Sequence, residues 1–150
     1  MKFKLLIAPL IAVTMIVCNQ SCKQEGANSQ NDKISSTDEK SGVYFVNLKD
    51  GDKVKSPVVV QMGVRGMEVE PAGAYNDDKG HHHLIVDGSY VEKDEMVPKD
   101  ETHLHFGKGQ TIDTLKLSPG DHTLTLQFAD GLHKSYGKDW SATIKITVIE

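Results

Sequence analysis

Histidine is the residue type whose number and spacing suggest chemistry in this chain. Seven of the 150 residues are histidines, and five of them lie in two short groups, at residues 81–83 and 103–105. On a strand, the first and last histidine of each group would share one face. Imidazole nitrogens suit copper(II) or zinc, with bonds of about 2 Å. The two groups therefore predict a transition-metal site whose ligands are His81, His83, His103 and His105.

Two more histidines are candidates for additional ligands. His122 has the parity of the apolar residues that follow it, so it begins a core-facing row. His133 follows Asp130-Gly131 in a loop that could close over a site from above. Met67 offers a thioether, which would favour copper(I) in a reduced site.

A structural explanation of the histidines stays open beside the metal site. Buried histidines often only satisfy backbone carbonyls and neighbouring carboxylates, and an exposed run of three would be a solvated surface. His82 points away from His81 and His83 on a strand, toward the core with Leu84 and Val86. A hydrogen bond on that side would make His82 structural.

Motifs for catalysis or nucleic-acid binding are missing. The Gly107-Lys108-Gly109 segment lacks the first glycine and the Ser/Thr of a phosphate loop, no Gly-x-Ser-x-Gly is present, and no cysteine follows Cys22. A net charge of −4 does not attract nucleic acid. We predict no catalytic residues and favour a binding module over an enzyme, although a copper oxidase-like activity stays open.

Polar and apolar residues alternate with period two from Val43 onward, which is typical of strands with one face on a core and one toward solvent. Turn signals separate these segments. The pattern predicts an all-β, immunoglobulin-like antiparallel β-sandwich of about seven strands, with a small closed barrel as the second choice. The expected strands are 43–48, 58–64, 81–86, 103–106, 111–117, 123–128 and 140–148.

The first 22 residues are typical of a bacterial lipoprotein signal. Lys2 and Lys4 precede an apolar run over residues 5–17, which is too short to span a bilayer. Cys22 follows the small residue Ser21 and is the predicted lipidated residue, while Cys18 fits less well and an ordinary cleaved signal is the alternative. The expected location is the bacterial cell envelope, on the periplasmic or surface side.

Polar residues 23–40 predict a disordered tether, and residues 41–150 then form a single β-sandwich domain. The expected partners are the membrane, through the N-terminal lipid, and a metal ion; no protein partner is indicated.

Three strings of the sequence are distinctive: GHHHLIVD at 80–87, HFGKGQT at 105–111 and LSPGDHTL at 117–124. With these strings, the chain resembles a bacterial family of secreted proteins known only as domain of unknown function number 4399. The resemblance covers nearly all of residues 43–149 and implies a secreted or periplasmic setting but no activity.

These observations together predict a lipid-anchored envelope protein whose His-rich sandwich binds copper or zinc without catalysis. The alternative is a non-enzymatic adhesion or assembly module with structural histidines and no metal, which rests on fold analogy.

The lipid anchor predicts a specific mature N-terminus. Mass spectrometry of the protein from a bacterial envelope should find a diacylated or triacylated cysteine at position 22, because Ser21 precedes it and a polar segment follows. A free amine on any other residue would contradict this assignment.

Overall fold

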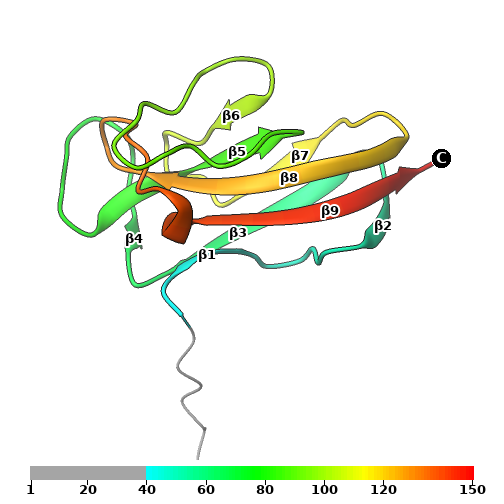
Figure 1. The fold of residues 1–150 in the computed structure, drawn as a ribbon, viewed down its shortest axis with the longest axis horizontal. Coiled ribbons are helices and arrows are strands. Elements are labelled where there is room, and N and C mark those ends of the chain that lie inside the picture. Colours follow the sequence, from blue (N-terminus) through cyan, green and yellow to red (C-terminus); the bar gives the residue numbers. More distant parts are fainter. Residues whose placement is uncertain (1–39) are drawn as a thin grey trace, which may run out of the picture. The chain divides into compact units, whose positions relative to one another are not determined.

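The computed structural model describes residues 40–150, so the predicted signal, Cys22 and nearly all of the tether lie outside the described residues. This part of the chain folds into nine strands and one 3-10 helix in two stacked sheets (Figure 1). The smaller sheet consists of β1 (Gly42–Phe45), β3 (Val58–Arg65) and β7 (Ile112–Leu115), all antiparallel.

The larger sheet has β5 (Lys79–Val86) and β8 (Gly120–Ala129) at its centre. β9 (Ser141–Ile149) pairs with the other edge of β8, and the short strand β2 (Asp52–Lys55) runs parallel to β9. Along the edge that faces away from β8, β5 pairs with two strands. β6 (His103–His105) is antiparallel to β5, and β4 (Glu68–Val69) is parallel to it. The helix η1 (Lys138–Trp140) leads into β9.

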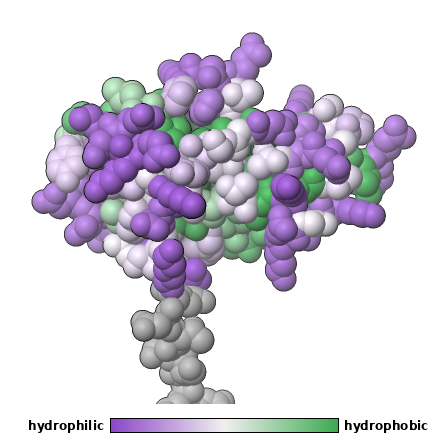
Figure 2. Space-filling view, in the orientation of Figure 1, coloured by the Kyte–Doolittle hydropathy of each residue, from purple (hydrophilic) through white to green (hydrophobic). Residues whose placement is uncertain are grey.

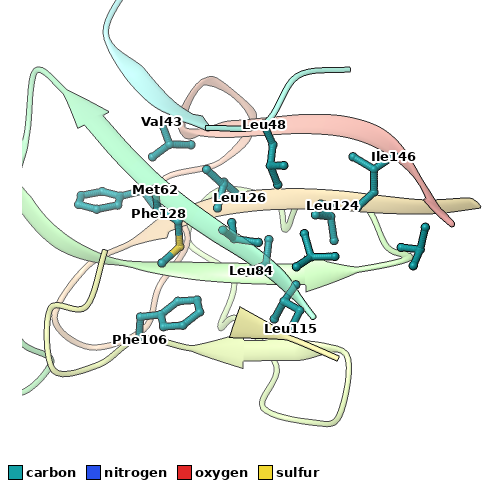
Figure 3. Packing of buried hydrophobic residues seen from close by; sticks show 13 residues of the cluster. Val43, Leu48, Met62, Leu84, Phe106, Leu115, Leu124, Leu126, Phe128 and Ile146 are labelled. Carbon is teal, nitrogen blue, oxygen red and sulfur yellow. The ribbon is translucent and has the colours of Figure 1, made fainter. Parts of the chain in front are cut away.

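Apolar side chains fill the space between the sheets, as the alternation predicts. Val60 and Met62 of β3 are buried while Val59 is 41% exposed. From the other sheet, Leu84 of β5 and Leu126 of β8 point into the same space (Figure 3). Removing these side chains from water is the main source of stability for such a fold.

The all-β sandwich predicted from the sequence is confirmed, with two differences in detail. Strands β2 and β4 are additional, and both are short parallel pairings that leave little alternation to detect. The expectation that one face of every strand meets solvent is wrong for β5 and β8. His83, Thr125 and Gln127 lie on their outer faces and are at most 1% exposed.

Two connections cover this outer face. The long segment between β5 and β6 runs above β5 in Figure 1, and the backbone N–H of Val91 donates to Oε1 of Gln127 at 3.1 Å. The segment after β8 adds the Gly137 carbonyl, which accepts from Nε2 of Gln127. The histidines at 81–83 are therefore not a solvated surface run. Elsewhere on the face seen in Figure 2, hydrophilic side chains surround small groups of apolar residues.

His82 lies on the inner face of β5, as its parity predicts, and its ring meets Phe128 edge-on with centroids 5.1 Å apart. The expected hydrogen bond is absent, since neither ring nitrogen of His82 has a partner among the described residues. The ring therefore acts as an aromatic core side chain.

His122 carries a pH-dependent contribution to stability. Its Nδ1 is 2.9 Å from Oδ2 of Asp87, and its Nε2 is 3.0 Å from the Ser118 carbonyl, so both ring nitrogens face acceptors. The hydrogen bond with Asp87 raises the pKa of His122 above its ordinary 6.5 despite partial burial. The folded protein thus favours the doubly protonated ring.

We predict that the stabilisation from His122, measured as the unfolding free energy of wild type minus that of His122→Gln, falls as pH rises from 6.5 through the raised pKa of His122, because the unfolded chain has already lost that proton. Below pH 6.5, His122→Gln should be less stable than wild type by about 1 kcal/mol. This figure is the contribution of a charge-assisted hydrogen bond, reduced because Asp87 is exposed. Urea unfolding from about pH 6 to about pH 9 measures both effects. The difference between wild type and Asp87→Asn should shrink over the same pH range, and differences that stay constant with pH for both variants would contradict the assignment.

Candidate metal centre

Four imidazoles converge on the outer face of the larger sheet. His81 and His83 come from β5, His105 from β6 and His133 from the turn after β8. Nε2 of His81 is 3.0 Å from Nε2 of His83 and 3.2 Å from Nε2 of His105. Nε2 of His105 is in turn 3.0 Å from Nε2 of His133. One ligand nitrogen from each of His81, His105 and His133 lies within 4.8 Å of the other two.

Strand pairing sets this convergence. In the antiparallel register of β5 and β6, His83 lies directly opposite His105. His81 is two residues from His83 on the same face of β5, so its ring joins the pair. On the other side of β5, Gln127 and Ala129 of β8 lie opposite His83 and His81. The small Ala129 side chain adds little bulk beside the His81 ring.

His133 reaches the cluster through an unusual backbone conformation. Its φ is 70°, in the left-handed region that residues other than glycine rarely adopt. The Asp130 carboxylate holds the turn, since Oδ1 accepts from the backbone N–H of Leu132 at 2.8 Å and of Lys134 at 2.9 Å. Asp130 is only 6% exposed. Such strain at a candidate site is consistent with positioning a functional side chain.

Two glycines make room for the cluster. A Cβ on Gly107 would overlap the Cε1 and Nε2 atoms of His105, so only glycine leaves space for that ring. A Cβ on Gly131 would overlap the Ala74 carbonyl, which closes against the His133 turn. At both positions glycine is therefore required because a side chain would overlap a neighbouring group.

The contacts within the cluster cannot all be hydrogen bonds. A ring nitrogen carries either one proton or one lone pair, never both. His81 Nε2 faces two nitrogens, and so does His105 Nε2, so at most two of the three contacts can be well-aligned N–H···N bonds. A cation that accepts every lone pair removes this conflict. Nitrogens bound tetrahedrally to zinc at about 2.0–2.1 Å lie about 3.3–3.4 Å apart, close to the three distances between successive nitrogens here.

Burial favours the neutral form of three of these rings, His81, His83 and His105. His81 and His83 are at most 1% exposed, while His105 and His133 are half-buried. Burial, aided by His105 and His133, lowers the pKa of His81 to about 4, and burial lowers the pKa of His83 further. Burial, His133 and Lys99 lower the pKa of His105. Neutral imidazole is the form that binds metal ions.

The second nitrogens of the two most buried rings lack partners. Nδ1 of His81 and Nδ1 of His83 make no hydrogen bond within residues 40–150. Metal-bound histidines usually donate this N–H to a carboxylate or carbonyl. The cluster therefore has ligand atoms in place with an incomplete supporting shell.

A pocket of about 240 Å³ connects the cluster to the surface. His83, His105 and His133 line its floor, and the segment between β5 and β6 supplies the rest of the wall through Met96, Val97, Pro98 and Lys99. His81, which is 0% exposed, does not line this pocket. The pocket gives a small solute access to three of the four imidazoles.

The family model described as Domain of unknown function (DUF4399) matches residues 60–149, more than half of the chain and all four converging histidines. The chain belongs to the DUF4399 family. No curated protein and no solved structure matches it. The DUF4399 match supports the resemblance drawn from the sequence and assigns no activity.

The DUF4399 fold holds two of the predicted ligands elsewhere. His103 shares a face with His105, but it lies opposite Ile85 and its Nδ1 is 2.8 Å from Oδ1 of Asp100. In β8, His122 lies on the face opposite the one that carries the cluster, and its Nδ1 contacts Oδ2 of Asp87. Met67 packs against the hydrophobic core and lines a different pocket. The structure thus gathers four of the six predicted histidines.

Sequence reasoning missed the residues that position the ligands. Asp130 and Gly107 carry the geometry of His133 and His105, and Met96 lines the pocket. The Asp-Gly pair at 130–131 signals a turn, but nothing in that signal places the turn against β6. In the sequence, Gly107 resembles an ordinary hairpin glycine. Its steric role becomes visible only when the position of the His105 ring is known.

The backbone of His133 yields a stability prediction. With a chelator present, His133→Asn should have a free energy of unfolding equal to or higher than wild type, because asparagine tolerates left-handed φ and the imidazole conflict is reduced. His133→Ala should be less stable than His133→Asn by about 1 kcal/mol. Urea unfolding measures both. A marked loss of stability in His133→Asn would instead indicate that the imidazole is a structural hydrogen bonder.

Proposed function

We propose that this protein is a cell-envelope lipoprotein whose β-sandwich binds a transition metal, copper or zinc. His81, His105 and His133 are the core ligands and His83 is the fourth. The protein binds and handles the ion and does not act as a catalyst. An open pocket above the imidazoles suits exchange of an ion with the surroundings.

One observation carries the metal proposal: the Nε2 atoms of His83, His81, His105 and His133 form a chain of three contacts at 3.0–3.2 Å that hydrogen bonds alone cannot satisfy. Leaving buried polar atoms unsatisfied costs about 1–3 kcal/mol each. A cation turns this cost into binding free energy. Imidazole nitrogens without thiolates or carboxylates suit copper and zinc better than magnesium or calcium.

A purely structural role explains the cluster less well. A structural network would direct each imidazole to a carbonyl or a carboxylate, as His103 and His122 do. In contrast, His81 and His83 have no such partner for Nδ1. The protein thus contains both kinds of histidine, and the two kinds differ in their surroundings.

The envelope location rests on the sequence. A basic start, an apolar run and Cys22 support export and lipidation. Within residues 40–150, no helix is long and apolar enough to cross a membrane. A lipid on Cys22 would attach the sandwich to the membrane through residues 23–40.

Calorimetric titration of the tag-free, full-length chain with copper(II) and with zinc tests the metal proposal. Cys18→Ser and Cys22→Ser are included in every variant so that no thiol competes. The wild-type cluster should bind one ion, and His105→Ala should weaken binding about ten-fold or more, a loss at least as large as that from supporting groups.

His103→Ala and His82→Phe are the matched controls. His103 lies on the same strand as His105 but is bonded to Asp100, so its removal should leave the affinity unchanged within about two-fold. His82→Phe should keep the affinity and should not lower the melting temperature, because an apolar ring replaces two unsatisfied buried nitrogens. Equal losses in His103→Ala and His105→Ala, or no binding in the wild type, would refute the site.

A further inference from the structure

Met96 is an exposed methionine at the mouth of the histidine pocket. It lines the same pocket as His83, His105 and His133, and 63% of it is exposed. Exposed apolar side chains are common on protein surfaces and by themselves indicate no function. A thioether, however, is a soft ligand that prefers copper(I).

The backbone beside Met96 is fixed next to the turn that carries His133. Met96 pairs with Lys134 in an isolated antiparallel bridge. Its neighbour Val97 is 5% exposed, and the backbone N–H of Val97 donates to the His133 carbonyl at 3.0 Å. The Met96 side chain has three rotatable bonds beyond this anchored backbone, which lets its sulfur reach into the pocket or turn out to solvent.

Charge around the pocket adds no net attraction for a divalent ion. The converging ligands are four imidazoles, which bind a cation without contributing charge, and the exposed Lys99 ammonium lines the same pocket. Its repulsion acts twice as strongly on a doubly charged ion as on a singly charged one. The nearby Asp130 supplies one buried negative charge, and its Oδ1 already accepts two backbone N–H groups. The two charges offset each other, so the choice among cations falls to the donor atoms of the site.

We propose that Met96 is a further, soft ligand of the site and that copper(I) is the ion it serves. The thioether of Met96 takes the ion at the pocket mouth and completes its coordination above His105 and His133. This inference rests on the proposed metal-binding function and narrows it to one ion and one entry side.

Met67 provides a matched control. It packs partly buried against the hydrophobic core and lines a pocket that contains none of the four histidines. Met67→Leu and Met96→Leu make the same chemical change, and both keep an apolar side chain of similar volume. A difference between them therefore reports the position of the sulfur.

The test measures affinities for copper(I), copper(II) and zinc in the full-length chain carrying Cys18→Ser and Cys22→Ser. Copper(I) is supplied anaerobically in competition with a chromophoric copper(I) chelator. Met96→Leu should weaken copper(I) binding about ten-fold or more and change zinc and copper(II) binding by less than about three-fold. Met67→Leu should change none of the three, and Lys99→Gln should strengthen zinc and copper(II) binding more than copper(I) binding. Thermal melts of each variant check the fold.

Each result has a distinct meaning. Unchanged copper(I) affinity in Met96→Leu, or an equal loss for all three ions, would overturn the role of Met96 while leaving the histidine site intact. Failure of the parent chain to bind any of the three ions would overturn the proposed function itself. Equal losses in Met67→Leu and Met96→Leu would show that the sulfur position does not matter and would also overturn the inference.

Discussion

Burial of both faces of β5 is the constraint on which the rest of the structure depends. The inner face places Leu84 in the core, and the outer face places His81 and His83 under the two long connections. A strand covered on both sides usually carries apolar residues on both. Here one face carries imidazoles instead, so the covering segments must either satisfy those nitrogens or leave them facing one another. In the structure, these nitrogens face one another.

The covering segments are themselves tied together around the cluster. The hydrogen bond from Val97 to the His133 carbonyl joins the β5–β6 connection to the turn after β8. Ser135 adds a second link, because its hydroxyl donates to the Val91 carbonyl at 2.8 Å. The imidazoles of His105 and His133 therefore sit on a braced framework, although neither lies at the centre of a long strand. Such support is what a binding site needs to hold its ligands in place.

Much of this arrangement follows from the sequence, and the part that does not has a physical reason. Period-two alternation identifies β3, β8 and β9 and assigns His81 and His83 to one face. Parity alone separates His122 from that face, yet parity cannot separate His103 from His105. His103 differs from His105 because the Asp100 carboxylate contacts its ring, and this contact forms only when the turn is folded. The role of Gly107 is hidden for a similar reason, since a missing Cβ matters only when another ring occupies its space.

The ligands come from three separate segments, with His81 and His105 24 positions apart and His105 and His133 28 positions apart. An unfolded chain keeps His81 and His83 close together but rarely brings all three segments to one ion, so most of the affinity arises with the native topology. An ion bound there would shift the folding equilibrium toward the native state by mass action. An occupied metal site would then indicate that the sandwich has folded. A chain exported before folding would acquire its ion in the compartment where it folds.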